Sequence, residues 1–390
     1  MDRIYLDYAA TTPVAQSVIE AMLPYFGTEF GNPSSAHYYG QLAEGAIEQS
    51  RRDIKKVFNA DDYDVIFTSG GSESDNLALR GAALEQRKRN GATKILISSV
   101  EHDAVGHTAA QLQQKSGFIS VKLRVAKNGI VDLSQLKEQL NKQVVLVSII
   151  YGNNEVGSIN PIKEAAKLCH EHGILFHTDA VQAAAHLKID LSDLDVDYLS
   201  ISAHKFYGPK GVGALFKKKF LPLLPQITGG GQESGFRAGT SNVPLIVGMV
   251  KALEINNESI NAENSRLIAL RDKLITNVLR TIPESQLTGH IKDRLSNHAS
   301  FVFDGLSGND LLIALDMAGY AVSSGSACKV GNPKPSEVLL ALGIKPSLAL
   351  GSLRVTLGKS TSENDLDKLL TDLPEVVKNL RKEKQLKNGN

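Results

Sequence analysis

VVLVSII, residues 144–150, is an almost wholly apolar run, rich in valine and isoleucine and without polar alternation. This pattern is typical of a strand that is covered on both faces, as in a parallel sheet. Helical patterns lie between such runs, and Pro161 and Gly173 mark the two ends of one of them. The other candidate strands of the first two thirds are residues 64–67, 94–98, 121–125, 174–177, 198–202 and 212–216. This alternation predicts an α/β fold with a mostly parallel, seven-stranded sheet flanked by helices.

The pattern changes after about residue 255. Leucines at helical spacing predict a helix over 264–281 and a final helix that begins near Ser362, with strands at 300–303 and 352–357. This mixture indicates a second, smaller α+β domain. We divide the chain into a large domain, residues 16–255, and a small domain formed by residues 1–15 and 256–390.

Composition limits the possible functions. The 390 residues include 43 Lys and Arg against 42 Asp and Glu, and this balance argues against a polyanion binder. Cys169 and Cys328 are too few for a disulfide framework or a cysteine-rich zinc site. There is no apolar signal core at the start and no run of membrane-spanning length. We therefore expect a cytoplasmic protein that binds neither membranes nor, directly, nucleic acids.

SAHKFYGPKG, residues 202–211, directly follows the predicted strand 198–202. A lysine at a strand end, beside a histidine and before glycine-rich backbone, suits an amine held near a cofactor. Lysine attacks carbonyl groups only when desolvation or cationic neighbours lower its pKa. Lys205 is therefore a candidate catalytic residue, although a surface lysine in a turn gives the same pattern.

TSGGSESDN, residues 68–76, follows the predicted strand 64–67. Gly70 and Gly71 let backbone N–H groups approach an anion, and Ser72 can cap the helix that follows, whose N-terminus favours negative charge. The stretch predicts a phosphate-binding turn that is neither a Walker loop nor a G-x-G-x-x-G fingerprint. A plain glycine turn with a helix cap explains the same residues equally well.

Three further polar clusters follow predicted strands, at residues 101–103, 153–155 and 177–182. A carboxylate such as Asp179, emerging from a buried strand, is costly unless a cation meets it. A protonated ring nitrogen of a ligand would serve, and so would a salt bridge within the protein. Because sheets of this class bind ligands outside the carboxyl ends of their strands, five such clusters predict one site at that edge.

Cys328 lies in SSGSACKVGNPK, residues 323–334, an unusually long glycine- and serine-rich connection. Structural cysteines are usually buried, and the adjacent Lys329 favours a thiolate. Cys169, by contrast, continues the apolar spacing of a helix and is predicted to belong to its core. CHEH, residues 169–172, lacks further ligands, so we predict solvated polar surface there and no metal site.

In this order, the motifs resemble those of the pyridoxal-phosphate (PLP) cysteine desulfurases of the IscS/NifS type, which are fold-type I enzymes of the class-V aminotransferase family. The resemblance begins at YLDYAATT, residues 5–12, passes through GNPSS, residues 31–35, and extends to Arg354. It implies PLP as cofactor, L-cysteine as substrate and a homodimer. It also implies that the large domain binds PLP and that the small domain carries the catalytic cysteine loop, at about residues 323–336.

The resemblance implies a role for each matched residue. Lys205 matches the lysine that forms the Schiff base with PLP, and Asp179 matches the partner of the pyridinium nitrogen, which keeps the ring an electron sink. Cys328 matches the sulfur-accepting nucleophile, and Arg354 matches the arginine whose planar fork grips the substrate carboxylate. The remaining matches are Gly71, Ser72, Ser202 and His204 at the phosphate, Thr240 reaching it from the neighbouring subunit, Gln182 and Asn154 around the ring, Asn154 also at the substrate, and His102 stacked on the ring.

The implied reaction converts L-cysteine to L-alanine and leaves a persulfide on Cys328. Lys205 takes the Cα proton and His102 shuttles protons, because histidine exchanges them near neutral pH. The sulfur then passes to an iron–sulfur scaffold or a tRNA-thiolation enzyme. KVGNPK, residues 329–334, is unlike the usual variants of the family, so the identity of the sulfur acceptor stays open. Gly71-Ser72 stands where the family more often has Ala-Thr, and this change keeps the hydroxyl group. Ala203 stands where Gly is common, and this difference does not affect the assignment.

Three alternatives remain open at this point. An aminotransferase of the same fold has no need of Cys328, and a selenocysteine lyase would strongly prefer selenocysteine. A catalytically silent scaffold would only dock partners of a sulfur relay. The presence of Lys205, Asp179 and Cys328 together argues against the scaffold.

Overall fold

The computed structural model describes residues 3–325 and 334–388, and a seven-stranded sheet forms the centre of its larger part. The strand order is β2-β8-β7-β6-β5-β3-β4. β8 is antiparallel to both of its neighbours and all other pairings are parallel, which confirms the predicted architecture. The strands are β2 (Tyr63–Thr68), β3 (Lys94–Ser98), β4 (Ile119–Leu123), β5 (Val144–Ser148), β6 (Leu175–Asp179), β7 (Tyr198–Ser202) and β8 (Gly213–Lys218).

Helices cover both faces of this sheet, and successive strand residues are therefore buried on opposite sides. In β2, Val65 and Phe67 face one hydrophobic cluster while Ile66 faces another. This double burial explains why the strand sequences show no polar alternation. α3 (Gly71–Asn90) and α4 (Asp103–Ser116) cover one face, and α2 (Tyr38–Phe58), α6 (Ile162–Glu171), α7 (Ala183–His186) and α8 (Leu191–Leu194) pack on the other.

A smaller part of the molecule contains two short sheets. β9 (Ser285–Leu287), β10 (His298–Phe303) and β12 (Ser352–Thr356) form an antiparallel sheet in the order β12-β10-β9. β1 (Ile4–Tyr5) pairs in parallel with β11 (Tyr320–Ala321), so the start of the described chain packs against its C-terminal third. α10 (Gly308–Met317) and α13 (Glu363–Asn388) share a hydrophobic cluster with these strands.

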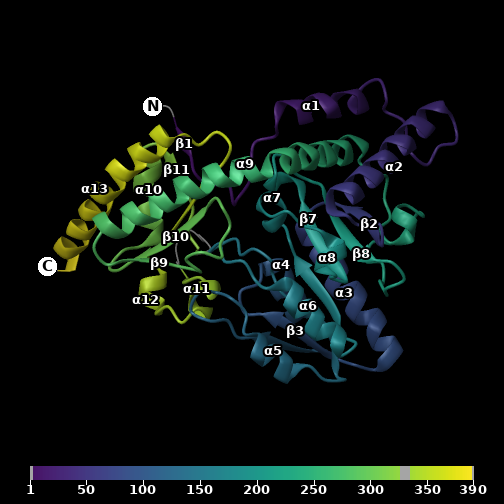
Figure 1. Cartoon of the computed structure of the whole chain (residues 1–390), viewed down its shortest axis with the longest axis horizontal. Coiled ribbons are helices and arrows are strands. Elements are labelled where there is room, and N and C mark those ends of the chain that lie inside the picture. The colour runs from purple at the N-terminus through teal and green to yellow at the C-terminus, as the bar shows by residue number, and fades with distance from the viewer. Residues whose placement is uncertain (1–2, 326–333, 389–390) are drawn as a thin grey trace.

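One long helix, α9 (Val243–Thr281), extends from the larger part to the smaller part (Figure 1). Asn242 caps it by accepting a hydrogen bond from Leu245 N–H. Its first turns, including Leu253, pack on the large sheet, whereas Leu267 and the later turns pack in the smaller part. The helix expected at 264–281 is thus only the second half of α9. The division at residue 255 stays a prediction, and it falls inside this helix.

The ends that the sequence predicts for helices and strands are only partly correct. β4 begins at Ile119 rather than at the predicted residue 121. Pro161 is the N-cap of α6 and not its first residue, while Gly173 directly follows the C-cap residue His172 and has a left-handed φ of +67°. Ser72 does not cap α3, because Gly70 is the N-cap and no side chain caps that end.

The remaining elements are short. They are α1 (Gln16–Met22), η1 (Leu23–Phe26), α5 (Leu133–Gln139), η2 (Ala203–Lys205), η3 (Glu233–Gly235), α11 (Glu337–Ala341) and α12 (Pro346–Ala349). Within residues 3–325 and 334–388, no helix combines the length and the apolarity needed to cross a bilayer.

Candidate active site

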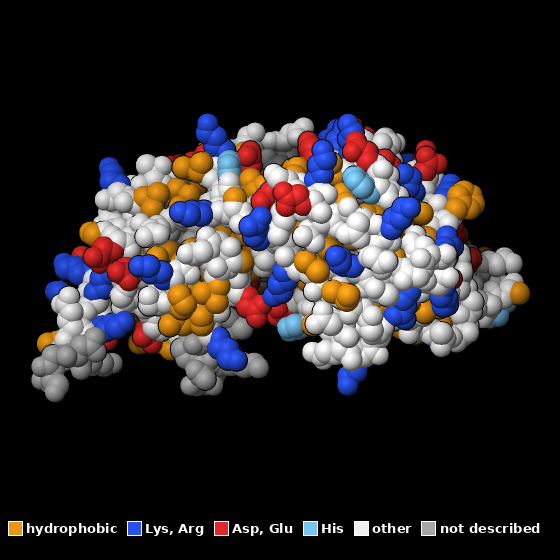
Figure 2. Space-filling model, turned by 90° about the horizontal axis from the view of Figure 1, so that it is seen from below, with side chains coloured by type: hydrophobic (Ala, Val, Ile, Leu, Met, Phe, Trp, Pro, Cys, Tyr) orange, Lys and Arg blue, Asp and Glu red, His pale blue; other side chains and the backbone are white. Residues whose placement is uncertain are grey.

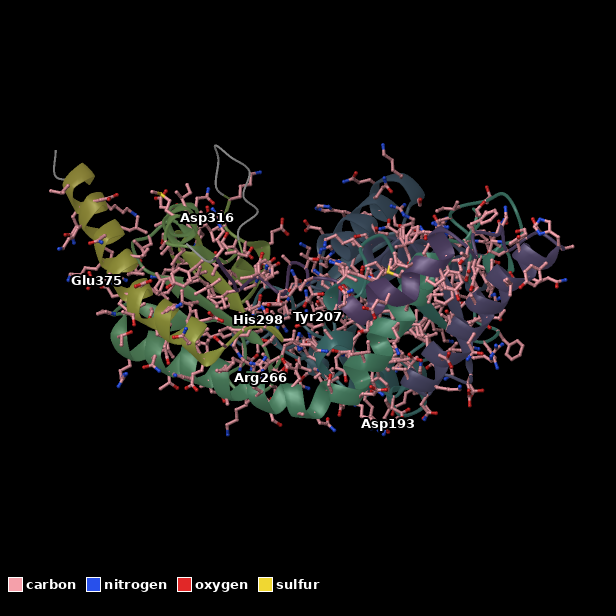
Figure 3. The ribbon with its side chains drawn as sticks, turned by 90° about the horizontal axis from the view of Figure 1, so that it is seen from above. Asp193, Tyr207, Arg266, His298, Asp316 and Glu375 are labelled. Carbon is pink, nitrogen blue, oxygen red and sulfur yellow. The ribbon has the colours of Figure 1, made fainter. Side chains whose placement is uncertain are left out.

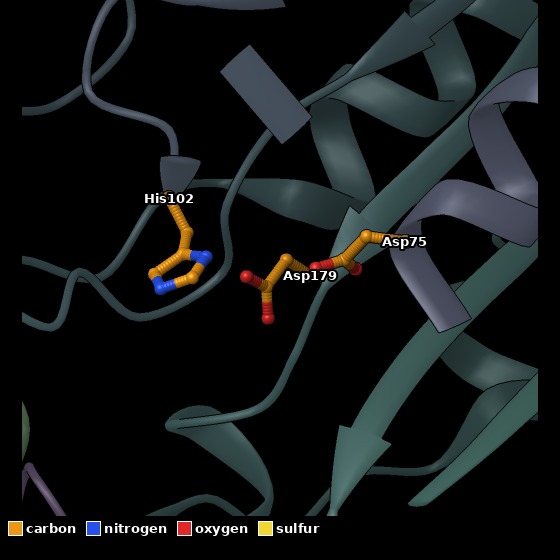
Figure 4. Close-up of side chains that lie close together, drawn as sticks. All are labelled: Asp75, His102 and Asp179. Carbon is orange, nitrogen blue, oxygen red and sulfur yellow. The ribbon is translucent and has the colours of Figure 1, made fainter. Parts of the chain in front are cut away.

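The five polar clusters predicted from the sequence do meet at one edge of the sheet. They follow β2, β3, β5, β6 and β7, which all run in the same direction. Asp179, the last residue of β6, lies between His102 and Asp75 (Figure 4), and the polar atoms of these three side chains are all within 4.8 Å of one another. The topology of parallel strands therefore builds the site.

Asp179 is a buried carboxylate without an ion-pair partner among the described residues. Its Oδ1 accepts a hydrogen bond from Val181 N–H at 2.8 Å. Burial raises the pKa of Asp179, and the nearby His102 and Lys205 oppose that rise. A buried carboxyl group in this position favours a cationic group opposite it.

Lys205 lies at the end of η2, directly after β7. Its Nζ donates hydrogen bonds to the carbonyl oxygens of Ala9, at 2.7 Å, and Ala10, at 2.8 Å. Burial, reinforced by the positive charge of Arg354, lowers the pKa of Lys205 to about 8. A substantial fraction of this amine is therefore neutral and nucleophilic near physiological pH.

The segment 9–12 forms one wall of the site, a role that sequence reasoning missed. Gln182 donates from Nε2 to the carbonyl oxygen of Ala9 at 2.8 Å. His204 Nδ1 lies 3.2 Å from Thr11 Oγ1, and burial lowers the pKa of His204 to about 4. The motif YLDYAATT was the available signal, but it gave no indication that this segment crosses the strand ends.

The glycine turn before α3 lies beside the end of β7. A Cβ on Gly71 would stand 3.6 Å from Ser202 Cβ and 2.6 Å from Val181 Cγ2. No side chain caps this end of the 20-residue helix α3, so its first N–H groups suit an anion. Ser72, in the first turn of the helix, is exposed beside them. The predicted phosphate residues Gly71, Ser72 and Ser202 are thus brought together.

Arg354 comes to the site from β12 in the smaller part. Its Nη2 pairs with Asp7 Oδ1 at 2.7 Å, and its Nη1 donates to the carbonyl oxygen of Asn154 at 2.9 Å. Arg354 Nε is buried without a partner. Asp7, which sequence reasoning did not assign, therefore holds the predicted substrate-binding arginine.

The site lies where the two parts of the molecule meet. His298, from β10, contacts the carbonyl oxygen of Asn154 through Nε2 at 3.1 Å. Tyr207 Oη accepts a hydrogen bond from Lys359 N–H at 2.7 Å. Figure 3 shows both His298 and Tyr207 near the middle of the molecule, between its two halves. Such junctions are common places for ligand sites.

His102 is the exposed N-cap residue of α4. Its Nδ1 accepts a hydrogen bond from Ala104 N–H at 3.1 Å. The proton of the neutral ring is therefore assigned to Nε2, which leaves that nitrogen as the donor. A fixed tautomer with a free edge suits the predicted role in proton transfer.

Cys328 lies outside the described residues. The residues on either side of its segment approach one carboxylate: Ser336 Oγ donates to Glu155 Oε2 at 2.5 Å, and a Cβ on Gly325 would lie 2.9 Å from that same oxygen. Burial raises the pKa of Glu155 to about 7. Glu155 belongs to a predicted cluster, but its position at this junction was not foreseen.

Two predicted residues lie away from the strand ends. Thr240 is exposed and makes no hydrogen bond to the strand-end residues, and the preceding turn is held by an Arg237–Glu73 pair at 2.9 Å. Cys169 is fully buried in α6, as predicted. The adjacent His170 contacts Asp197 at 3.1 Å.

Comparisons with known proteins agree with this geometry. The chain matches the class-V aminotransferase family over residues 4–369. It is 44% identical over 381 residues to a cysteine desulfurase IscS of Clostridium botulinum, covering 97% of this chain and 95% of that one. It is 43% identical over 378 residues to the IscS of Methanosarcina thermophila, covering 97% and 93%.

Solved structures give the same result. A NifS-like protein superposes with a TM-score of 0.90 at 34% identity, covering 97% of this chain and all of the other. A structure described as SspA in complex with cysteine superposes with a TM-score of 0.77 at 34% identity, covering 90% and 98%. The chain therefore belongs to the class-V aminotransferase family, among the cysteine desulfurases of the IscS/NifS type.

Proposed function

We propose that this enzyme is a PLP-dependent cysteine desulfurase that converts L-cysteine to L-alanine and transfers the sulfur to Cys328. The proposal rests on three groups that meet at one edge of the sheet. They are the amine of Lys205, whose pKa is lowered, the buried carboxyl group of Asp179, and the guanidinium of Arg354, which can bind a carboxylate. An aminotransferase would also need these groups. The similarity to cysteine desulfurases along nearly the whole chain favours sulfur chemistry.

The residues present fit the cofactor. The carboxylate of Asp179 has no ion-pair partner among the described side chains, as expected for a group that meets a pyridinium nitrogen. The uncapped start of α3, with Gly71 and Ser72, suits the phosphate, together with Ser202 and His204. PLP, when bound, supplies an electron sink that weakens the bonds to the substrate Cα and makes the carbon–sulfur bond cleavable.

The chain's own residues would position the substrate and move its protons. Arg354 would bind the α-carboxylate, beside Asn154. Lys205 would hold the cofactor and, once released, take the Cα proton, because its amine is partly neutral. His102 would shuttle protons through Nε2. Gln182, held by Ala9, would support the ring of the cofactor.

The sulfur transfer balances without an added oxidant or reductant. The Cys328 thiolate bonds to the substrate sulfur as the carbon–sulfur bond breaks, and the electron pair of that bond stays on carbon, where a proton completes alanine. The product on the enzyme is a persulfide. The positive charge of Lys329, the next residue in the sequence, favours the thiolate form of Cys328.

The test is alanine release from L-cysteine by the wild type and by Cys328→Ala, with Cys169→Ala as the matched control. Cys169 is fully buried and should be dispensable for turnover. We expect alanine from the wild type and the control, and loss of turnover with retained PLP absorbance in Cys328→Ala. Equal alanine from all three proteins would remove Cys328 from the mechanism. A strong preference for selenocysteine would identify a lyase instead.

We also propose a homodimer in which Thr240 reaches the phosphate site of the neighbouring subunit. The support is a group of exposed apolar side chains on η1, on the loop that follows it and at the start of α2. Phe26 is 62% and Phe30 is 66% exposed, and Phe30 stacks on Tyr39 with ring centroids 5.4 Å apart. Single exposed apolar residues are common, but clusters of them mark interaction surfaces.

The sulfur acceptor and the cellular location are proposals as well. We propose a cytoplasmic enzyme that supplies an iron–sulfur scaffold or a tRNA-thiolation enzyme with sulfur. On the face seen in Figure 2, acidic and basic side chains are interspersed, and the net charge is only +1. This charge distribution supports a protein acceptor rather than direct binding of nucleic acid.

A further inference from the structure

A second buried carboxyl group, Asp75, lies behind Asp179 on α3 (Figure 4). Asp75 is only 1% exposed, and its Oδ1 has no hydrogen-bond partner. The catalytic roles proposed above do not use this residue. An unpartnered buried oxygen is costly in its ionised form, so its presence calls for an explanation.

The groups that face Asp75 cannot neutralise a negative charge on it. His177 Nε2 is 3.6 Å from Asp75 Oδ1, but His177 is fully buried and its Nδ1 and Nε2 contact the hydroxyls of Ser148 and Ser200 at 2.9 and 3.0 Å. Burial lowers the pKa of His177 to about 3, which keeps the ring neutral. The hydroxyl of Ser200 lowers the pKa of Asp75, but it carries no charge.

The other titratable neighbours of Asp75 are acidic. Asp179 and Glu101 both raise the pKa of Asp75, in addition to the effect of burial. Glu101 is itself tied to Ser98 Oγ at 2.5 Å and Ile150 N–H at 2.7 Å, and burial raises its pKa to about 8. Two carboxyl groups as close together and as buried as Asp75 and Asp179 do not both ionise.

The two aspartates differ in what stabilises a charge. Asp179 accepts a hydrogen bond from Val181 N–H, and His102 and Lys205 lower its pKa, whereas the neighbours that act on the pKa of Asp75 are Asp179, Glu101 and the hydroxyl of Ser200. A single negative charge shared by the pair therefore resides on Asp179. The proton resides on Asp75.

We propose that Asp75 is a positioning residue, held as a neutral carboxylic acid, that keeps the Asp75–Asp179 pair at one negative charge and so presents an ionised Asp179 to the ring nitrogen of the cofactor. The proposal rests on the proposed function for the role of Asp179. The protonation state of Asp75 is measured independently of turnover.

The first test is the infrared spectrum of the holoenzyme labelled with ¹³C in the aspartate side-chain carboxyl, near neutral pH. Because only aspartates carry the label, the infrared band of Glu101 does not shift. The main measurement uses the wild type, so it requires no substitution that endangers folding. We expect a protonated-carboxyl band that shifts with the label and is absent from Asp75→Asn. Absence of the band from the wild type overturns the proposal, and so does its survival in Asp75→Asn.

The second test is thermal unfolding of the holoenzyme against pH. The folded wild type binds a proton that the unfolded chain releases above its ordinary aspartate pKa, so its stability falls as pH rises. Asp75→Asn lacks this proton. The unfolding temperature of the variant minus that of the wild type should therefore increase as the pH is raised from about 5 to about 8. If Asp75 has only a structural role, the difference in unfolding temperature between variant and wild type is the same at every pH. That result would overturn the proposal. Asp62→Asn, at an exposed position, is the control and should show no trend.

These readouts separate the inference from the proposed function. Loss of alanine release with the band and the pH trend intact would refute the desulfurase and leave the state of Asp75 established. Normal alanine release with a flat pH trend would retain the desulfurase and refute the role of Asp75.

Discussion

Arg354 enters the site already paired with another carboxylate. Asp7 holds Nη2 and the backbone of Asn154 holds Nη1, so the plane of the guanidinium is fixed before any substrate arrives. A planar fork loses little entropy on binding a carboxylate when its orientation is already set. Asp7 therefore acts on the substrate through Arg354.

Asp7→Asn should raise KM for L-cysteine about tenfold, or about 1.4 kcal/mol in binding, and change kcat much less. The substitution removes the charge that fixes the Arg354 fork but keeps an oxygen acceptor. The measurement is steady-state alanine release, with exposed Asp62→Asn as the control. A fall in KM would show instead that Asp7 competes with the substrate for Arg354.

Lys205 should become reactive at a lower pH than an ordinary lysine. Burial and Arg354 lower its pKa to about 8, so the neutral fraction grows as the pH rises through that value. The rate at which apoenzyme recombines with PLP should follow the same curve. Arg354→Gln removes one of the charges that lower this pKa, and its midpoint should therefore move to higher pH. Coincident midpoints for the two proteins would contradict the electrostatic account.

At the scale of the element, the start of α3 depends on close packing against the segment after β6. Gly71 stands where a side chain would meet Val181, and this contact brings the helix N-terminus next to Ser202. Val181 also donates its N–H to Asp179. One contact between two element ends thus couples the phosphate-binding turn to the carboxylate.

Gly71→Ala should destabilise the protein by about 1–3 kcal/mol, because its Cβ would lie 2.6 Å from the stiff Val181 side chain. Val181→Ala in the same chain should restore most of the loss. The measurement is urea unfolding of the holoenzyme, together with PLP affinity. Gly106→Ala, in α4, is the matched control because no atom lies within 4 Å of its added Cβ. Additive effects of Gly71→Ala and Val181→Ala would rule out the contact.

At the scale of the whole molecule, the site is assembled from segments that are distant in sequence. The N-terminal segment, the ends of five parallel strands and β12 all contribute. α9 joins the two parts as one continuous helix, and the hydrogen bond from Arg354 to Asn154 connects the same two parts at the site. The exposed cluster at Phe26 and Phe30 extends this assembly, on our proposal, to a second subunit.

Replacing both Phe26 and Phe30 by Ser should convert a dimer into a monomer, because it removes the exposed apolar area that would be buried between subunits. Light scattering coupled to gel filtration measures the mass, and PLP retention is expected to fall with it. Phe220→Ser is the control, since Phe220 is 95% exposed on the loop after β8. An unchanged mass in the double variant would place the interface elsewhere.

The sequence alone determined which residues form the buried strands and which polar residues follow them. VVLVSII and its counterparts predict strands because double burial demands apolar residues at every position, which is a local property of the sequence. The clusters that contain Lys205, Asp179 and His102 were predicted to meet at one site, because parallel strands bring their carboxyl ends to one edge, whereas the roles of these residues came from the family resemblance. Cys169 was placed correctly in a helix core by its spacing.

Only the tertiary structure decided the strand order, the antiparallel placement of β8 and the continuity of α9, because these depend on which surfaces pack together rather than on local periodicity. The pairing of Asp7 with Arg354 joins residues 347 positions apart, and no pattern along the chain encodes it. Asp75 looks like an ordinary polar residue in the first turns of a helix until the fold buries it behind Asp179. Burial sets the charge of such groups, and burial is a property of the folded molecule.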